Sequence, residues 1–235
     1  MIIVVGNEKG GVAKTATATN LAVLAVEAGI DTELIDTDLQ GSARAWCRIR
    51  KSANVNPFIP MKGEIDDFKK DLLHESTKYQ LIIVDIGAQN YSALVACSME
   101  ADLVIVPTGP DQFEVESTVK VIRNLKKLDS EHRLGRVPAW VLMNRTPAVR
   151  NSREEAALKE CLSSAGMPLL NTILRDRTVW RTSRREGKAV HEVRGRLHVA
   201  DAKAVAETEE LFNEVMTMLS ETQSGRGKDT KKVGA

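Results

Sequence analysis

Cysteine is scarce in this sequence of 235 residues, and its three cysteines lie far apart. Cys47, Cys97 and Cys161 are odd in number and lack the paired spacing of a zinc site or of a disulfide framework. This pattern argues against a small secreted fold held by disulfides. We therefore expect reduced thiols, as in a cytosolic protein.

Long apolar runs are also missing. The short apolar run at residues 2–5 leads into a turn rich in glycine and lysine, so it does not have the form of a cleavable signal peptide. No stretch approaches the ~18 apolar residues that a membrane-spanning helix needs. We expect a soluble, cytoplasmic protein that has no membrane among its partners.

An excess of charge of either sign is absent as well. The chain has 33 basic and 32 acidic residues, which gives a formal net charge of +1. The overall field therefore indicates neither a nucleic acid nor a membrane as partner. Such a partner has to be inferred from local clusters of charge.

Short β-branched runs alternate with longer helical patterns along most of the chain. The runs fall at residues 2–5, 32–35, 81–84, 103–106, 140–143 and 172–174, and the helical patterns at 15–28, 90–100, 114–128 and 152–165. This alternation is typical of an α/β fold with a mostly parallel sheet and helices on both faces. The expected fold class is α/β of the P-loop NTPase type.

The remaining segments complete this organisation. Residues 52–62 contain Pro57 and Pro60 and are predicted to be a loop or an edge strand. A helix is expected at 201–219, with Asp201 as its N-cap. The last residues are rich in Ser, Gly and Lys, so we predict one ATPase domain at 1–220 and a disordered tail at 221–235.

A glycine-rich turn between the first predicted strand and helix carries the strongest chemical signal. Glycines let backbone amides approach phosphate groups, the helix N-terminus adds its positive dipole, Lys14 supplies a full charge, and the Thr15 hydroxyl can bind Mg²⁺. The general pattern G-x-x-x-x-G-K-[ST] nevertheless fails at two positions, which are Glu8 and Ala13. The predicted nucleotide contacts are Lys9, Gly10, Gly11, Val12, Ala13, Lys14, Thr15 and Ala16.

This turn resembles the deviant Walker A motif of the ParA/MinD superfamily, which is usually K-G-G-x-G-K-[ST]. Only Ala13 departs from that version. Alanine fits if the position has a negative φ, whereas a positive φ would cost ~1 kcal/mol or more. The resemblance covers residues 1 to about 219 and implies ATP and Mg²⁺ as cofactors. In this superfamily the lysine at the position of Lys9 reaches the phosphates held by a second subunit, so a homodimer formed with ATP is implied.

Three acidic residues follow predicted strands, where parallel sheets bind ligands. Asp36 and Asp38 stand in a segment that resembles the D-x-D-x-Q-G stretch of ParA proteins. That resemblance gives Asp38 the role of positioning the attacking water and Asp36 a supporting role at the Mg²⁺ shell. Asp85 ends an apolar strand of the Walker B form and is expected to hold Mg²⁺ through water. Taken alone, each acid could instead cap a helix or a turn.

The chain departs from the family after Asp85, because Ile86-Gly87-Ala88 replaces the usual Asp-x-Pro-Pro. The conformation of this switch segment is left open by the sequence. Asn144 ends a later strand that resembles the one whose asparagine contacts adenine. It is equally compatible with a turn residue that caps backbone groups.

A local cluster of cations is the candidate DNA-binding segment. Six basic side chains fall within fourteen residues, and they are Arg175, Arg177, Arg181, Arg184, Arg185 and Lys188. In ParA proteins the corresponding region carries DNA-contacting arginines, so non-specific DNA is a predicted partner of the dimer. The alternatives are a solvated arginine face, or one or two arginines that close over the nucleotide.

The resemblance as a whole points to a small ParA-type ATPase for DNA partition. The first strand begins at Ile2, so no N-terminal helix-turn-helix domain is expected. Such a protein associates with the nucleoid and is stimulated by a centromere-binding (ParB/ParG-like) protein.

Three alternatives stay open beside partition. One is a MinD-like positioning ATPase at a membrane, although the last predicted helix is rich in glutamate, which an anionic membrane would repel. A second is an accessory ATPase of DNA transfer. A third is a redox relative with a cysteine-bound cluster, although Cys97 and Cys161 lack a cluster context and are expected to be buried apolar residues.

Overall fold

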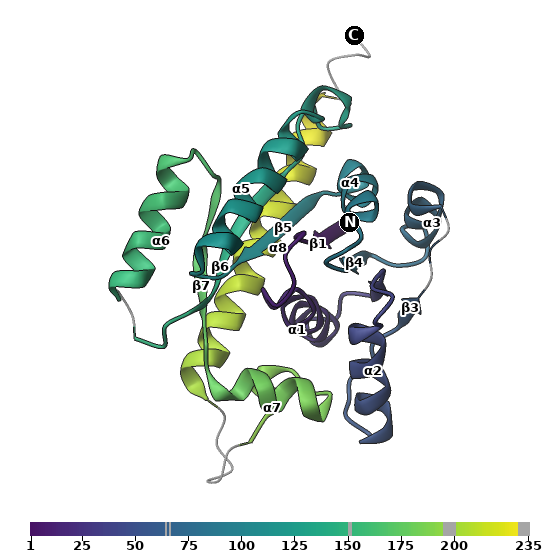
Figure 1. The fold of residues 1–235 in the computed structure, drawn as a ribbon. Coiled ribbons are helices and arrows are strands. Elements are labelled where there is room, and N and C mark those ends of the chain that lie inside the picture. Colours follow the sequence, from purple (N-terminus) through teal and green to yellow (C-terminus); the bar gives the residue numbers. More distant parts are fainter. Residues whose placement is uncertain (64, 66, 150–151, 195–200, 230–235) are drawn as a thin grey trace.

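The computed structural model describes residues 1–229 apart from 64, 66, 150–151 and 195–200. Its centre is a sheet of seven parallel strands in the order β3-β2-β4-β1-β5-β6-β7 (Figure 1). The strands are β1 Ile2–Val5, β2 Thr32–Asp36, β3 Met61–Gly63, β4 Leu81–Asp85, β5 Leu103–Thr108, β6 Ala139–Thr146 and β7 Leu169–Arg175. The predicted fold class is confirmed.

Helices cover both faces of this sheet. One face is covered by α1 Lys14–Glu27, α2 Ser42–Ser52, α7 Thr178–Glu186 and α8 Ala202–Asp229. The other is covered by α3 Phe68–Glu75, α4 Tyr91–Glu100, α5 Gln112–Lys126 and α6 Arg153–Ser164. Two short 3-10 helices, η1 Asp129–Glu131 and η2 Val190–Glu192, complete the described elements.

The central strands are apolar on both sides because each side packs against helices. In β1, Ile2 and Val4 face the core beneath α4 and α5, while Ile3 and Val5 face the core beneath α1. This double burial explains why the strands read as continuous β-branched runs. The same arrangement brings the carboxyl ends of β1, β2 and β4 to one edge of the sheet.

Several expectations about elements need correction. The segment 52–62 is mostly loop and leads into the edge strand β3 at Met61–Gly63, whereas α2, α3 and α7 were not predicted. Residues 221–229, predicted to belong to a disordered tail, continue helix α8, while 230–235 lie outside the described residues. Cys97 is buried as expected, whereas Cys161 is exposed. Within the described part of the chain, no helix is long and apolar enough to cross a membrane.

Candidate nucleotide site

The glycine-rich loop joins β1 to α1 and closes around Lys14. The side chain of Lys14 is 8% exposed, and its Nζ donates a hydrogen bond to the carbonyl oxygen of Lys9 at 2.9 Å. Burial lowers the pKa of Lys14, an effect opposed by the charges of Asp85 and Asp38. The loop thus holds a partly desolvated cation beside two carboxylates.

Ala13 adopts the conformation that the sequence left in question. It has φ 65° and ψ 31°, directly before the first residue of α1. This left-handed conformation costs an L-residue about 1 kcal/mol relative to glycine. The glycine usual at this position is therefore replaced here by a residue that strains the loop.

Asp85 and Thr15 form the part of the site suited to a cation. Thr15 Oγ1 donates to Asp85 Oδ2 at 2.6 Å, while the buried Asp85 Oδ1 has no hydrogen-bond partner among the described residues. Burial raises the pKa of Asp85 to about 7. A free carboxylate oxygen beside a hydroxyl is a donor set that fits Mg²⁺.

Asp36 and Asp38 occupy the loop after β2 but have different surroundings. Asp36 is buried, and its Oδ1 and Oδ2 accept hydrogen bonds from the backbone amides of Asp38 and Arg44, each at 2.9 Å. Because both oxygens hold the loop, these contacts favour a positioning role for Asp36 over direct metal binding. Asp38 is only partly buried and lines the cavity beside Lys14.

Contacts with the loop after β2 fix the segment that follows Asp85. The Thr37 amide donates to the Asp85 carbonyl at 3.0 Å, and Asn90 Nδ2 donates to the Thr37 carbonyl at 3.3 Å. A Cβ atom on Gly87 would lie 2.9 Å from Asp38 Cα, so only glycine permits this approach. The departure from the family sequence therefore still gives a segment packed against Asp38.

A cavity of about 450 Å³ connects these groups to helix α7. Its lining includes the glycine-rich loop, Asp38, Asn144, Trp180, Arg181 and Arg184. Asn144 is buried; its Nδ2 donates to Thr17 Oγ1 at 3.3 Å and its Oδ1 accepts from the Arg145 amide at 2.8 Å. Asn144 thus both lines the cavity and holds a turn, so neither of its two predicted roles is excluded.

Two further residues belong to this site and were not identified from the sequence. Arg145 has φ 54°, and its Nη1 donates to the Gly11 carbonyl at 2.8 Å and to Glu114 Oε1 at 3.0 Å. Asn7 is buried and its Nδ2 donates to the Pro107 carbonyl at 2.8 Å. Asn7 lies two residues after the apolar run 2–5 and Arg145 two residues after the apolar run 140–143, and a polar residue at this place was the available signal for both.

The predicted DNA-binding segment separates into an internal and an external part. Arg175 is buried and bonds Glu155 at 2.8 Å and Glu207 at 3.3 Å, and Arg177 bonds Glu207 at 2.8 Å. Including these two arginines in a DNA-binding surface is therefore a prediction that must be corrected, because they are held in ion pairs inside the fold.

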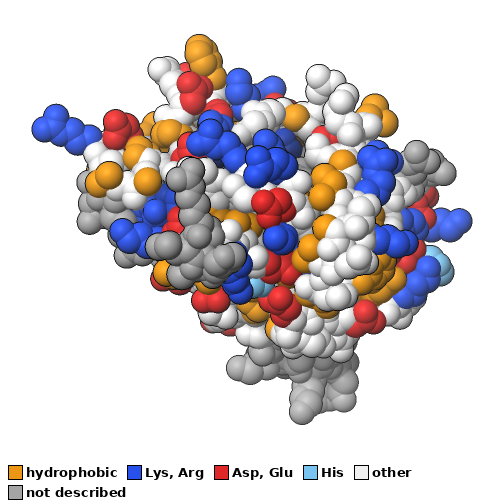
Figure 2. Space-filling model, turned by 90° about the horizontal axis from the view of Figure 1, so that it is seen from below, with side chains coloured by type: hydrophobic (Ala, Val, Ile, Leu, Met, Phe, Trp, Pro, Cys, Tyr) orange, Lys and Arg blue, Asp and Glu red, His pale blue; other side chains and the backbone are white. Residues whose placement is uncertain are grey.

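The external part lies on and after α7. Arg181, Arg184 and Arg185 are exposed, and the half-buried Lys188 pairs with Glu186 at 2.9 Å. Figure 2 views the molecule from below, the side on which α7 and α2 lie in Figure 1, and lysine and arginine side chains are spread over this face. Arg181 and Arg184 also line the nucleotide cavity.

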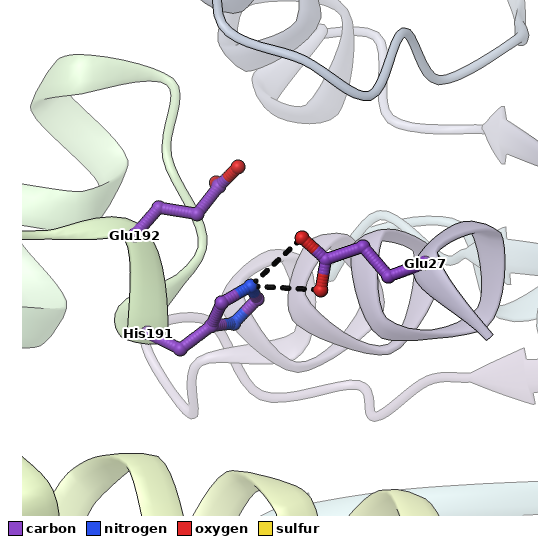
Figure 3. A group of neighbouring side chains, drawn as sticks. All are labelled: Glu27, His191 and Glu192. Atoms are coloured by element: carbon purple, nitrogen blue, oxygen red, sulfur yellow. Dashed lines mark hydrogen bonds and ion pairs between the residues drawn. The ribbon is translucent and has the colours of Figure 1, made fainter.

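A cluster of Glu27, His191 and Glu192 lies apart from this site (Figure 3). His191 Nε2 faces the Glu27 carboxylate at 2.9 and 3.1 Å. Both oxygens of Glu192 instead accept hydrogen bonds from the buried Arg50, at 2.7 and 2.8 Å. With Glu192 bonded to Arg50, the contact between His191 and Glu27 ties η2 to α1.

Comparison with known proteins decides the family. The model of the CobQ/CobB/MinD/ParA nucleotide binding domain matches residues 3–189. The chain belongs to this family. Proteins of the ParA/MinD type are ATPases that bind ATP with Mg²⁺, and the fit of Thr15 and Asp85 to a cation agrees with this.

Individual members of the ParA/MinD family differ in what they do. A maintenance of carboxysome distribution protein A from Gloeobacter kilaueensis is 30% identical over 211 residues, which cover 88% of this chain and 92% of that protein. The structure of a ParA family ATPase from Chlorobium tepidum is 19% identical, with a TM-score of 0.62 and coverage of 88% and 96%. The septum site-determining protein MinD of Pyrococcus horikoshii, complexed with Mg-ADP, is also 19% identical, with a TM-score of 0.67 and coverage of 94% and 98%. The two structures share the fold.

Proposed function

We propose that this chain is an ATP-switched positioning ATPase whose ATP-bound dimer binds DNA without sequence preference. One observation supports this most strongly: a single cavity is lined by the phosphate loop, by Asp38 and by Arg181 and Arg184 of α7. A nucleotide in that cavity would touch both the loop after β2, which carries Asp38, and helix α7, which carries the exposed arginines. ATP binding and DNA affinity would then be coupled.

The proposed chemistry uses residues of the loop and of the strand ends. Lys14 and the amides of residues 10–15 would hold the phosphates, and Thr15 with Asp85 would hold the cation. Mg²⁺, when bound, neutralises phosphate charge. Asp38 orients a water molecule toward the terminal phosphate from the loop that Asp36 keeps in shape.

Lys9 is proposed to join two copies. Its side chain is exposed, and its ammonium makes no ion pair with any described residue. Its carbonyl is held by Lys14 and its amide donates to Asn7 Oδ1 at 3.2 Å, so its backbone is fixed while its side chain points outward. An extended lysine on a fixed loop can reach phosphates bound by a facing subunit.

The DNA surface of the dimer is proposed to consist of Arg181, Arg184, Arg185 and Lys188. Contacts from such side chains to phosphates require no base recognition. Pairing two copies doubles the phosphates neutralised, so affinity should depend steeply on ATP and on salt.

We propose that the protein associates with the nucleoid. Its cargo is proposed to be a DNA locus bound by a centromere-binding (ParB/ParG-like) protein. A protein compartment is the second candidate, favoured by the 30% identity to a protein named for carboxysome distribution. The membrane alternative ranks lower, because the apolar stripe of α8, which includes Leu211, Val215 and Leu219, is buried in the core.

The proposed switch is tested with two variants and light scattering. With ATP, Asp38→Ala should form a persistent dimer that hydrolyses ATP at least tenfold more slowly, because phosphate contacts remain while the water-positioning group is lost. Lys9→Ala should bind ATP but lose both the dimer and hydrolysis. A Lys9→Ala variant that dimerises normally with ATP would refute the role given to Lys9.

A further inference from the structure

A second hollow lies beside the nucleotide site, between α2 and the edge strand β3. This groove has a volume of about 630 Å³. Arg44, Cys47, Arg48 and Lys51 line it from α2, where they recur three or four residues apart and so share one side of the helix. Phe58 and Leu39 line it from the flanking loops.

The groove combines exposed apolar side chains with charge of one sign. Leu39 is 95% exposed and Phe58 is 60% exposed. All charged side chains among its described lining residues are basic: Arg44, Arg48 and Lys51. Arg48 and Lys51 are exposed and form no ion pair with any described residue. Exposed apolar groups in a hollow favour a protein ligand over DNA, and the cations favour an acidic one.

The groove is in direct contact with the loop after β2, which carries Asp38. Arg44 Nη2 donates to the Asp38 carbonyl at 2.8 Å, and Arg44 Nε lies 3.6 Å from Asp36 Oδ2. Leu39 and Gln40, which line the groove, directly follow Asp38 in the chain. The Gln40 amide also donates to Asp38 Oδ1 at 3.0 Å. Whatever occupies the groove therefore contacts the loop that positions Asp38.

We propose that this groove binds an acidic, apolar segment of the partner protein, and that the bound segment adjusts the Asp38 loop for hydrolysis. The effect on hydrolysis rests on the proposed function, whereas binding to the groove does not. Carboxylates of the segment pair with Arg48 and Lys51, and its apolar side chains cover Leu39 and Phe58.

Binding is tested without nucleotide, so that failure of the ATP switch cannot affect the result. The probe is a fluorescein-labelled synthetic peptide that alternates glutamate and leucine, with a matched peptide carrying lysine in place of glutamate. The expected result by anisotropy is at least tenfold tighter binding of the glutamate peptide. Arg48→Glu combined with Lys51→Glu should weaken it at least tenfold. The pair Arg123→Glu, on α5, and Lys127→Glu, directly after it, alters net charge equally at exposed sites and should leave the affinity unchanged.

The site of binding is read by alkylation of Gln40→Cys in a Cys161→Ser background. Burial raises the pKa of both Cys47 and Cys97 to about 12, so the introduced thiol dominates the reaction. The glutamate peptide should slow its alkylation at least fivefold, and should leave the exposed Cys161 of the parent protein unprotected.

Three outcomes would overturn the proposal. In the first, the two peptides bind equally or both charge-reversal pairs lose equal affinity. In the second, the groove variant no longer dimerises with ATP under conditions in which the parent protein does, which would make the groove a contact with a second copy. In the third, the groove variant loses affinity for random-sequence duplex while retaining the glutamate peptide, which would assign the groove to DNA.

Discussion

At the level of single residues, the glycine-rich loop contains one residue whose left-handed backbone conformation is unfavourable for any residue with a side chain. Ala13 has φ 65°, a conformation that glycine adopts without cost. Ala13→Gly should therefore raise the free energy of unfolding by about 0.5–1 kcal/mol and tighten ATP binding, because loop strain is removed.

Urea denaturation and calorimetry with ATP measure these two effects. Ala53→Gly is the matched control, because Ala53 is exposed and has φ −86°. That change should lower stability. A loss of stability in both variants would contradict the strain assigned to Ala13.

Glu33 is a second residue with a measurable consequence. It lies on β2, 6% exposed, with Oε2 unbonded among the described residues. Burial, reinforced by the charge of Glu75 and opposed by Lys62 and Lys78, raises the pKa of Glu33 from 4.5 to about 7. At pH values between 4.5 and about 7, Glu33 keeps its proton in the folded state but has lost it in the unfolded state. The free energy of unfolding should therefore fall as the pH rises through this range.

Glu33→Gln tests this directly, since glutamine cannot ionise. Between pH 5 and 8 the parent protein should lose on the order of 2 kcal/mol of stability from this group, given about 1.4 kcal/mol per pKa unit. The variant should lack that contribution. The free energy of unfolding of both proteins is measured by urea denaturation across this pH range. If it changed with pH in the same way for the parent protein and for Glu33→Gln, Glu33 would have an ordinary pKa.

At the level of elements, the sequence predicted strands better than helices. The six predicted strands coincide with real ones because burial leaves each with a short run rich in apolar and β-branched residues, and Asp36 and Asp85 could be placed since each directly follows such a run. Helix α7 was not predicted because its sequence is dominated by polar and charged residues and only Val179 and Ser183 are buried. Its arginines therefore looked like a single charged segment.

The fate of Arg175 could not be predicted for a related reason. Its partners Glu155 and Glu207 come from α6 and α8, which only the folded chain brings together. Sequence spacing groups Arg175 with the exposed arginines of α7, although Arg175 is buried in ion pairs and also lines the nucleotide cavity. The distinction between the two kinds of arginine is a tertiary property.

This distinction predicts opposite consequences for two arginines of one segment. Arg175→Ala should destabilise the fold by about 3–5 kcal/mol, because it leaves buried carboxylates unpaired. Arg185→Ala should change stability by less than about 0.5 kcal/mol, because its side chain is exposed. Urea denaturation of both variants measures the difference. Equal effects would mean that Arg175 is not an internal residue.

At the level of the whole molecule, the proposed functional regions lie along one continuous surface. The nucleotide cavity touches α7 through Arg181 and Arg184, and it touches the groove beside α2 through the loop that carries Asp38. DNA and partner are thus proposed to act on the same nucleotide from different sides. The nucleotide in the cavity would decide whether the surface on α7 binds DNA, and the partner in the groove would act on its hydrolysis.

The most direct test of this account is a titration of random-sequence duplex with the protein in ATP and in ADP, at several salt concentrations. The triple variant Arg181→Ala, Arg184→Ala, Arg185→Ala is the control. We predict that the protein binds the duplex with ATP but not with ADP, and that its affinity falls steeply as salt rises. The variant should bind more weakly and show a shallower salt dependence. Binding that ignores the nucleotide, or a variant with the affinity and salt slope of the parent protein, would contradict it.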